Sequence, residues 1–221
     1  SLAPDRHITL ELGRRLHDLT PDGDHSTKLS GVSLSKLFRI PGGPQYVIGE
    51  KGSCHVRDGS DWVPIPPAST RQLNSVHGPT HDLVHACGNG GTLPRLRGHT
   101  WEALELPDRR DLHAIEVSRQ GDIHLGGAGA ALCLRNGELI ALDAPEGDYV
   151  AIRSFKGRRY WGDTSWGLNV QDGDALVPFQ GLHYALSMHA SQDQLVITSW
   201  KEVFTFDGER WGGFQLSYDG D

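Results

Sequence analysis

A repeat of 35 to 39 residues is the feature that most constrains the fold of this chain. Turn glycines recur at spacings of 39, 39, 36 and 35 residues, and they are Gly59, Gly98, Gly137, Gly173 and Gly208. Three residues after each of these glycines stands a bulky apolar residue: Trp62, Trp101, Ile140, Leu176 and Trp211. A fixed period of this length indicates that the chain is built from copies of one supersecondary unit.

Each copy of the unit is predicted to hold four short β-strands. The third copy contains four such segments, which read DLHAIEVS, DIHLGG, AALCLRNG and LIALDAP. Tight hairpins need a positive φ and therefore favour Asp-Gly and Asn-Gly pairs. Such pairs stand at 58–59, 136–137, 172–173 and 207–208. No segment keeps a helical period. Four strands in about 35 to 40 residues are typical of a β-propeller blade.

We therefore expect an all-β fold, a single β-propeller domain over residues 1–221. Five blades are expected at approximately 34–67, 73–107, 112–145, 149–181 and 183–216. Residues 7–21 repeat the spacing of the outer strands of a blade, and they predict an N-terminal half-blade. The closed ring would then hold five or six blades, and the sequence leaves both counts open.

Two short motifs resemble known propeller families. Gly98-His99-Thr100-Trp101 resembles the tail of an Asp-box, and the repeat as a whole is similar to propellers of the photosystem II assembly-factor type and of sialidase-like hypothetical proteins. The string LFRIPGG at 37–43 is similar to the sialidase string whose arginine grips the substrate carboxylate. A sialidase site needs three arginines, a Tyr–Glu pair and an acid/base Asp, and this set is not recognisable in the chain. The resemblance therefore implies the propeller fold without an activity, and we predict no catalytic residue and no enzyme.

Composition narrows the class of partner. Lys and Arg together number 21 against 28 for Asp and Glu, which gives a formal net charge of -7. Affinity for nucleic acid comes from clustered positive charge, so a nucleic-acid partner is not expected. An acidic surface favours a basic protein partner instead. No apolar stretch is long enough for a membrane helix, so no membrane association is expected.

Cysteine and histidine patterns bear on compartment and cofactors. Three widely separated cysteines, Cys54, Cys87 and Cys133, do not make a disulfide framework, which indicates a reducing compartment and a cytoplasmic location. The first residues lack a signal-peptide core. None of the twelve histidines forms a persuasive metal-site pattern with neighbouring carboxylates, so no metal and no cofactor are predicted. The sequence leaves the oligomeric state open.

A cluster of aromatic and basic residues in the last two units is the candidate binding surface. Its members are Arg158, Arg159, Tyr160, Asp163, Trp166, Trp200 and Lys201. Aromatic side chains at loop tips anchor protein or sugar ligands, because flat rings bury a large area at a low cost in entropy.

These observations predict a non-catalytic, protein-binding propeller. An acidic chain of this kind suits an immunity or inhibitor protein that neutralises a bacterial toxin or effector. A carbohydrate-binding lectin is the alternative, and a propeller glycosidase or lyase is the third reading. The loop residues differ from unit to unit, which favours one asymmetric binding surface over repeated sugar sites.

Overall fold

The computed structural model describes residues 7–11, 15–29, 32–40, 42–104, 106–165, 167–180, 182 and 184–217. These residues divide into two compact units, which are treated separately below. The first takes in Ser1–Leu112 and Val117–Gly121, and the second takes in His113–Glu116 and Asp122–Asp221. That the two units act as one domain stays a prediction. No helix in the described part of the chain has the length and apolar character needed to cross a membrane.

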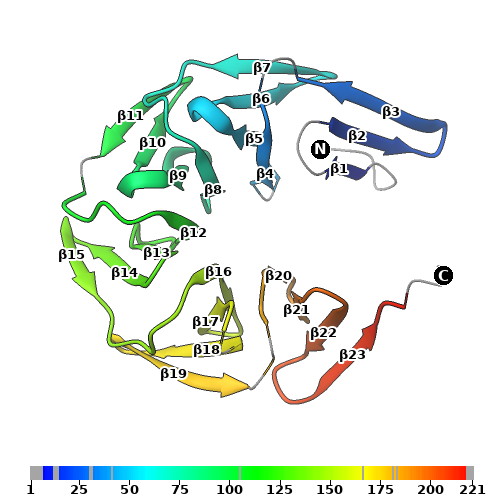
Figure 1. Cartoon of the computed structure of the whole chain (residues 1–221). Helices are drawn as coiled ribbons and strands as arrows, with labels where there is room; N and C mark the ends of the chain where they lie inside the picture. The colour runs from blue at the N-terminus through cyan, green and yellow to red at the C-terminus, as the bar shows by residue number, and fades with distance from the viewer. Residues whose placement is uncertain are drawn as a thin grey trace. The chain divides into compact units, whose positions relative to one another are not determined.

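The first unit contains three antiparallel sheets, coloured from blue to green in Figure 1. The N-terminal sheet has three strands, β1 (His7–Glu11), β2 (Arg15–Thr20) and β3 (Gly23–Lys28). The next has β4 (Leu34–Arg39), β5 (Gln45–Gly49), β6 (Cys54–Asp58) and β7 (Asp61–Ile65). The third has β8 (Leu73–His77), β9 (His85–Gly88), β10 (Leu93–Arg97) and β11 (Thr100–Leu104). Short 3-10 turns occur at η1 (Glu50–Gly52), η2 (His81–Leu83) and η3 (Asn89–Gly91).

The second unit contains three four-stranded sheets of the same meandering order. One has β12 (Leu112–Val117), β13 (Ile123–Gly127), β14 (Ala130–Arg135) and β15 (Glu138–Ala141). The two end residues of β12, Leu112 and Val117, belong to the first unit. The next has β16 (Tyr149–Phe155), β17 (Arg158–Asp163), β18 (Gly167–Asp172) and β19 (Ala175–Gln180). The last has β20 (Ser187–Ala190), β21 (Leu195–Thr198), β22 (Glu202–Phe206) and β23 (Trp211–Gln215).

The five repeats found in the sequence are thus five four-stranded sheets, as predicted. The two strands predicted within residues 7–21 are β1 and β2, and a third strand that was not predicted, β3, follows them in the same sheet. Strand β3 reads GDHSTK and is exposed at every position. It lacks the alternation of apolar and polar residues that identifies a strand in a sequence, so only its pairing with β2 shows it.

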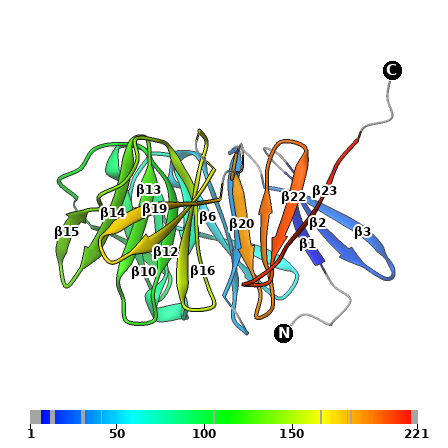
Figure 2. The ribbon, with the colours of Figure 1, turned by 90° about the horizontal axis from the view of Figure 1, so that it is seen from below.

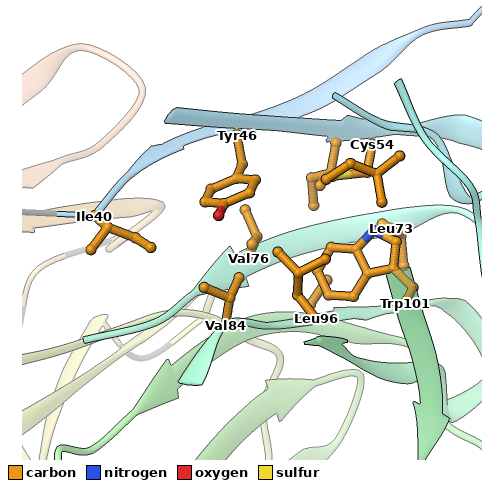
Figure 3. Packing of buried hydrophobic residues seen from close by; sticks show 11 residues of the cluster. Ile40, Tyr46, Cys54, Leu73, Val76, Val84, Leu96 and Trp101 are labelled. Atoms are coloured by element: carbon orange, nitrogen blue, oxygen red, sulfur yellow. The ribbon is translucent and has the colours of Figure 1, made fainter. Parts of the chain in front are cut away.

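Neighbouring sheets in each unit pack face to face through apolar side chains. In the first unit Tyr46 and Cys54 of one sheet meet Leu96 and Trp101 of the next, and all four are buried (Figure 3). In the second unit an aromatic cluster joins the last two sheets, and its core is the stacked pair Phe206–Trp211 with ring centroids 4.7 Å apart. Strands with apolar residues on both faces need such neighbours, because an isolated sheet leaves one face in water.

A second pair of glycines one repeat apart, Gly49 and Gly88, has a steric cause. Gly49 and Gly88 end equivalent strands in extended conformations, with φ of -176° and -167°. A Cβ on either glycine would lie 2.0 Å from a backbone oxygen, that of Ser33 or that of Gln72. These carbonyls precede the first strand of the same sheet. The period of the sequence therefore records a close backbone approach that recurs from sheet to sheet.

We expect Gly88→Ala to lower the free energy of unfolding by about 3 kcal/mol, because the new methyl group overpacks against the Gln72 carbonyl. Gly98→Ala is the matched control. Gly98 has a φ of +59° and open space around its Cβ, so only the left-handed conformation opposes the change, at about 1 kcal/mol. Urea unfolding of the two variants measures the difference. Equal losses would contradict the steric explanation.

Candidate functional site

Two members of the predicted binding cluster lie in the core of the second unit. Tyr160 is 2% exposed and packs edge-on against Phe179 and Phe206. Asp163 is fully buried, and its Oδ1 accepts a hydrogen bond of 2.7 Å from the backbone N–H of Ser165. Neither side chain is at a surface. Both therefore serve the packing and the hairpin geometry of their sheet, in contrast to the sequence prediction.

Arg159 belongs to a polar network between two sheets of the second unit. Its Nε donates to Glu116 Oε2 at 2.8 Å, and its guanidinium also donates to His124 Nε2 at 2.9 Å. Glu116 is 5% exposed and accepts a second hydrogen bond from Ser154 Oγ at 2.8 Å. A buried carboxylate is stable only with such partners. Arg159 therefore stabilises the contact between these two sheets, which we call the seam.

The same seam position recurs in the first unit with different chemistry. His77 precedes Glu116 by one repeat of 39 residues. The backbone N–H of Val117 donates to His77 Nδ1 at 3.0 Å, as the backbone N–H of Ser154 donates to Glu116. In these two places a side chain near the end of one strand accepts a hydrogen bond from the backbone of a following strand, which meets the requirement for burying a polar backbone group.

Arg158, Trp200 and Lys201 are exposed, but they do not lie together. Arg158 follows the turn between the first two strands of its sheet, and its guanidinium lies 5.2 Å from the centre of the Phe179 ring. Trp200 and Lys201 lie in the turn between the second and third strands of their own sheet. In an antiparallel meander these turns are at opposite ends of the strands. Figure 2 shows the strands from the side, with hairpin turns at both ends. The predicted cluster is therefore split.

Trp200 is the most exposed large hydrophobic side chain in the described part of the chain, at 73%. Leu216 lies beside this turn, because its backbone N–H donates to the Lys201 carbonyl at 2.6 Å. Leu216 is exposed as well. We call Trp200, Lys201 and Leu216 the Trp200 turn surface. Trp166, the other predicted anchor, lies outside the described residues.

A groove in the first unit was not identified from the sequence. It has a volume of about 620 Å³. Its lining residues are Pro44, Tyr46, Val56, Arg57, Asp58, Val63, Ile65, His81, Gly98 and His99. We call it the Tyr46 groove. It lies where the sheet β4–β7 faces the sheet β8–β11, above the buried cluster of Figure 3 that contains Tyr46 and Trp101.

The floor of the Tyr46 groove is apolar and its rim is polar. Val56 and Val63 are paired across two strands, and Val63 is 43% exposed. Toward the hairpin tip the next pair on the same face is Asp58 with Asp61, both exposed. His81 and His99 stand on the other wall. The groove therefore offers water-exposed apolar area beside two facing carboxylates.

Arg57 is a lining residue whose charge is already neutralised. Its Nη2 lies 2.7 Å from Asp18 Oδ2 in a buried ion pair, and its guanidinium lies 5.8 Å from the centre of the Trp62 ring. Among the described residues, neither Asp58 nor Asp61 has a basic side chain within ion-pair distance. The groove rim is therefore anionic.

The sequence holds little that could have identified this groove. Val63 occupies the same place in its repeat as Val177, and Val177 is equally exposed but lines no described groove. The one local signal is the DGSD turn at 58–61, which sets two aspartates opposite each other. Like charges in that position are unfavourable, and they are retained here at an exposed tip.

The three cysteines are buried. Burial raises the pKa of the Cys54 thiol to about 12, and it raises the pKa of Cys87 further. These thiols therefore stay protonated near neutral pH. No group of three His, Cys, Asp or Glu side chains in the described ranges is placed to hold a metal ion.

Comparison with curated proteins finds one informative relative. The chain is similar to immune protein Tsi7 of Pseudomonas aeruginosa, with 27% identity over 206 residues. This match covers 86% of the chain and 67% of Tsi7. No protein-family model matches the chain. Together with the fold, this relative supports the prediction of a non-catalytic binding propeller.

Comparison with solved structures shows the fold. YCF48 bound to D1 peptide has a TM-score of 0.68 at 12% identity, and the match covers 96% of this chain and 78% of that one. PorZ, a bacterial surface component of the type-IX secretion system of Porphyromonas gingivalis, has a TM-score of 0.74 at 10% identity, covering 98% of this chain and 32% of PorZ. The computationally designed Ika8 protein has a TM-score of 0.71 at 14% identity, covering 98% and 74%. The prediction of an all-β propeller is therefore confirmed, whereas the Asp-box and sialidase resemblances stay predictions.

We expect Glu116→Ala to lower the free energy of unfolding by about 3 to 5 kcal/mol, because Arg159 would keep a buried charge without its carboxylate. Glu102→Ala is the matched control. Glu102 pairs with Arg97 at 3.4 Å with both side chains more than half exposed, so its loss should cost about 0.5 kcal/mol or less. Chemical unfolding of both variants decides. A small loss for Glu116→Ala would show that the network is not structural.

We also expect stability to fall as the pH drops from about 6.5 to about 4. Burial lowers the pKa of His85 to about 4, and burial with the nearby Arg159 lowers the pKa of His124 to about 4. The unfolded chain takes up these protons near pH 6.5, so acid favours unfolding within that window. Each group contributes about 3 kcal/mol at most.

Urea unfolding at a series of pH values between 4 and 7 measures this dependence. His85→Gln and His124→Gln should each flatten the curve. A slope equal to that of the unsubstituted chain in both variants would contradict the assignment.

Proposed function

We propose that this chain is a non-catalytic immunity or inhibitor protein that neutralises a bacterial toxin or effector by binding it. The observation that carries the proposal is the similarity to immune protein Tsi7 along 86% of the chain. A net charge of -7 supports a basic partner, because complementary charge accelerates association and selects the partner. The proposal includes the cytoplasm as the place of action.

Two exposed surfaces support binding of a protein. The Trp200 turn surface presents an indole, an aliphatic side chain and an ammonium group within one turn and the strand end beside it. Tryptophan and tyrosine dominate the energetic centres of protein interfaces. The Tyr46 groove presents exposed apolar area with a polar rim. Apolar area rimmed by polar groups marks interaction sites on soluble proteins.

A rescue screen tests the proposed role directly. Genomic fragments from the source organism are expressed from an inducible promoter in a host with this chain or with an empty vector. We expect at least one fragment that arrests growth alone and is tolerated when the chain is present, and its product should copurify with the chain. Absence of any rescued fragment, with binding on a glycan array, would replace the proposal with the lectin alternative.

We expect Trp200→Ala to weaken binding of the rescued product by about tenfold or more, because interface tryptophans act as hot spots. Its folding stability should change little, since the side chain is 73% exposed. Leu19→Ala, on the N-terminal sheet, is the control at another exposed apolar residue. Titration calorimetry measures both. If the two variants bind alike, the Trp200 turn surface is not part of the interface.

A further inference from the structure

We propose that the Tyr46 groove binds a segment of the partner protein in which a large apolar side chain stands next to Lys or Arg. This inference rests on the proposed function, because it names the partner segment that one surface of the chain takes. Three features of the groove carry it, namely its size, its apolar floor and the uncompensated charge of its rim.

The groove has the size and lining of a side-chain site. Its volume of about 620 Å³ is within the range of about 300 to 1,000 Å³ in which proteins bind small ligands or anchor side chains. The floor is built by Tyr46, Val56, Val63 and Ile65. Tyr46 and Ile65 are each 4% exposed, so the base of the groove is rigidly packed. A preformed base lowers the entropy cost of binding.

The exposed part of the floor is where the segment would gain affinity. Val63 is 43% exposed, and its cross-strand partner Val56 is half-buried. Covering this area with an apolar side chain removes it from water, which is favourable at about 25 cal/mol per Å². A segment with only polar side chains would not gain this free energy of burial. The floor therefore selects an apolar anchor.

The rim selects the charge beside that anchor. Asp58 and Asp61 face each other directly across the β6–β7 hairpin. Like charges in directly opposed strand positions repel, so a cation placed between them is favoured. The nearest lining guanidinium, Arg57, is engaged by Asp18. An ammonium or guanidinium group of the partner can supply the missing counter-charge.

The basic residues of the opposite wall do not cancel this charge. Arg95 and Arg97 alternate along β10 with Leu96, and Leu96 faces the buried cluster under the groove. Side chains that alternate along a strand point to opposite faces, so neither arginine projects from the face that carries Leu96. Arg97 pairs with Glu102 at 3.4 Å. Arg95 donates to the Asp82 backbone carbonyl at 3.2 Å, and the carboxylate of the same Asp82 lies 3.0 Å from His81 Nε2.

The repeat provides matched controls for each feature. Val177 and Asp172 occupy the places of Val63 and Asp58 in another sheet, and Val177 is 46% exposed. Neither residue lines a described groove. Val63→Gln and Val177→Gln remove the same apolar group from equivalent exposed positions. Asp58→Asn and Asp172→Asn remove the same charge from equivalent hairpin tips.

The probe is a fluorescein-labelled peptide with the core Lys-Lys-Leu-Phe-Lys-Lys, and its counterpart carries Glu in place of every Lys. Fluorescence anisotropy with the full chain measures binding. We expect the Lys peptide to bind and the Glu peptide not to bind. Val63→Gln should weaken binding at least fivefold, whereas Val177→Gln should not change it. Asp58→Asn with Asp61→Asn should weaken binding and flatten its salt dependence.

Hydrogen–deuterium exchange locates the bound peptide. We expect protection of residues 44–65 and 81–99, and equal unfolding midpoints for the two glutamine variants. Absence of binding, equal effects of the Val63 and Val177 variants, or protection elsewhere would each overturn the assignment. If the chain protects cells from a toxin but does not bind the Lys peptide, only the assignment of the groove is overturned. Groove binding without any rescued toxin overturns only the toxin role.

Discussion

Face-to-face packing between neighbouring sheets is the interaction on which the rest of this structure depends. Each four-stranded sheet carries apolar side chains on both faces, so it cannot bury them alone. Tyr46 and Trp101 meet across one such contact, and Phe179 and Trp211 meet across another. Because the faces are occupied in this way, the surfaces left for a partner are mainly the hairpin turns and the outer strands.

Polar groups in these contacts are tied to the backbone of the next sheet. Glu116 and His77 stand one repeat apart and both accept a hydrogen bond from a following backbone N–H. Removing such a partner leaves a buried donor unsatisfied, which costs more than the bond itself contributes. Arg159, a charged residue that the sequence suggested for binding, therefore holds two sheets together.

The fold could be predicted from the sequence because the repeated residues are ones that local backbone geometry requires. Turn glycines such as Gly59 need a positive φ, and Gly88 has no space for a Cβ, so both recur with the period of the sheets. Strand β3 could not be predicted, since its side chains are all exposed and leave no pattern.

The candidate site was less predictable, because a sequence does not show which side of a strand is covered. Tyr160 and Trp200 look alike as aromatic residues near turns, yet one is buried and the other is 73% exposed. Val63 and Val177 are equivalent in the repeat and similarly exposed, and nothing in the repeat distinguishes Val63 as a lining residue of the Tyr46 groove. Exposure at each position depends on contacts between sheets, which the repeat alone does not encode.

The proposed function requires that this chain binds one copy of one protein partner. Native mass spectrometry of the chain with the toxin recovered by rescue tests this requirement most directly. We expect a single species with one chain and one toxin, which dissociates as the salt concentration rises. A chain that carries several copies of one ligand, or that forms no complex with the toxin it silences, would contradict the proposed function.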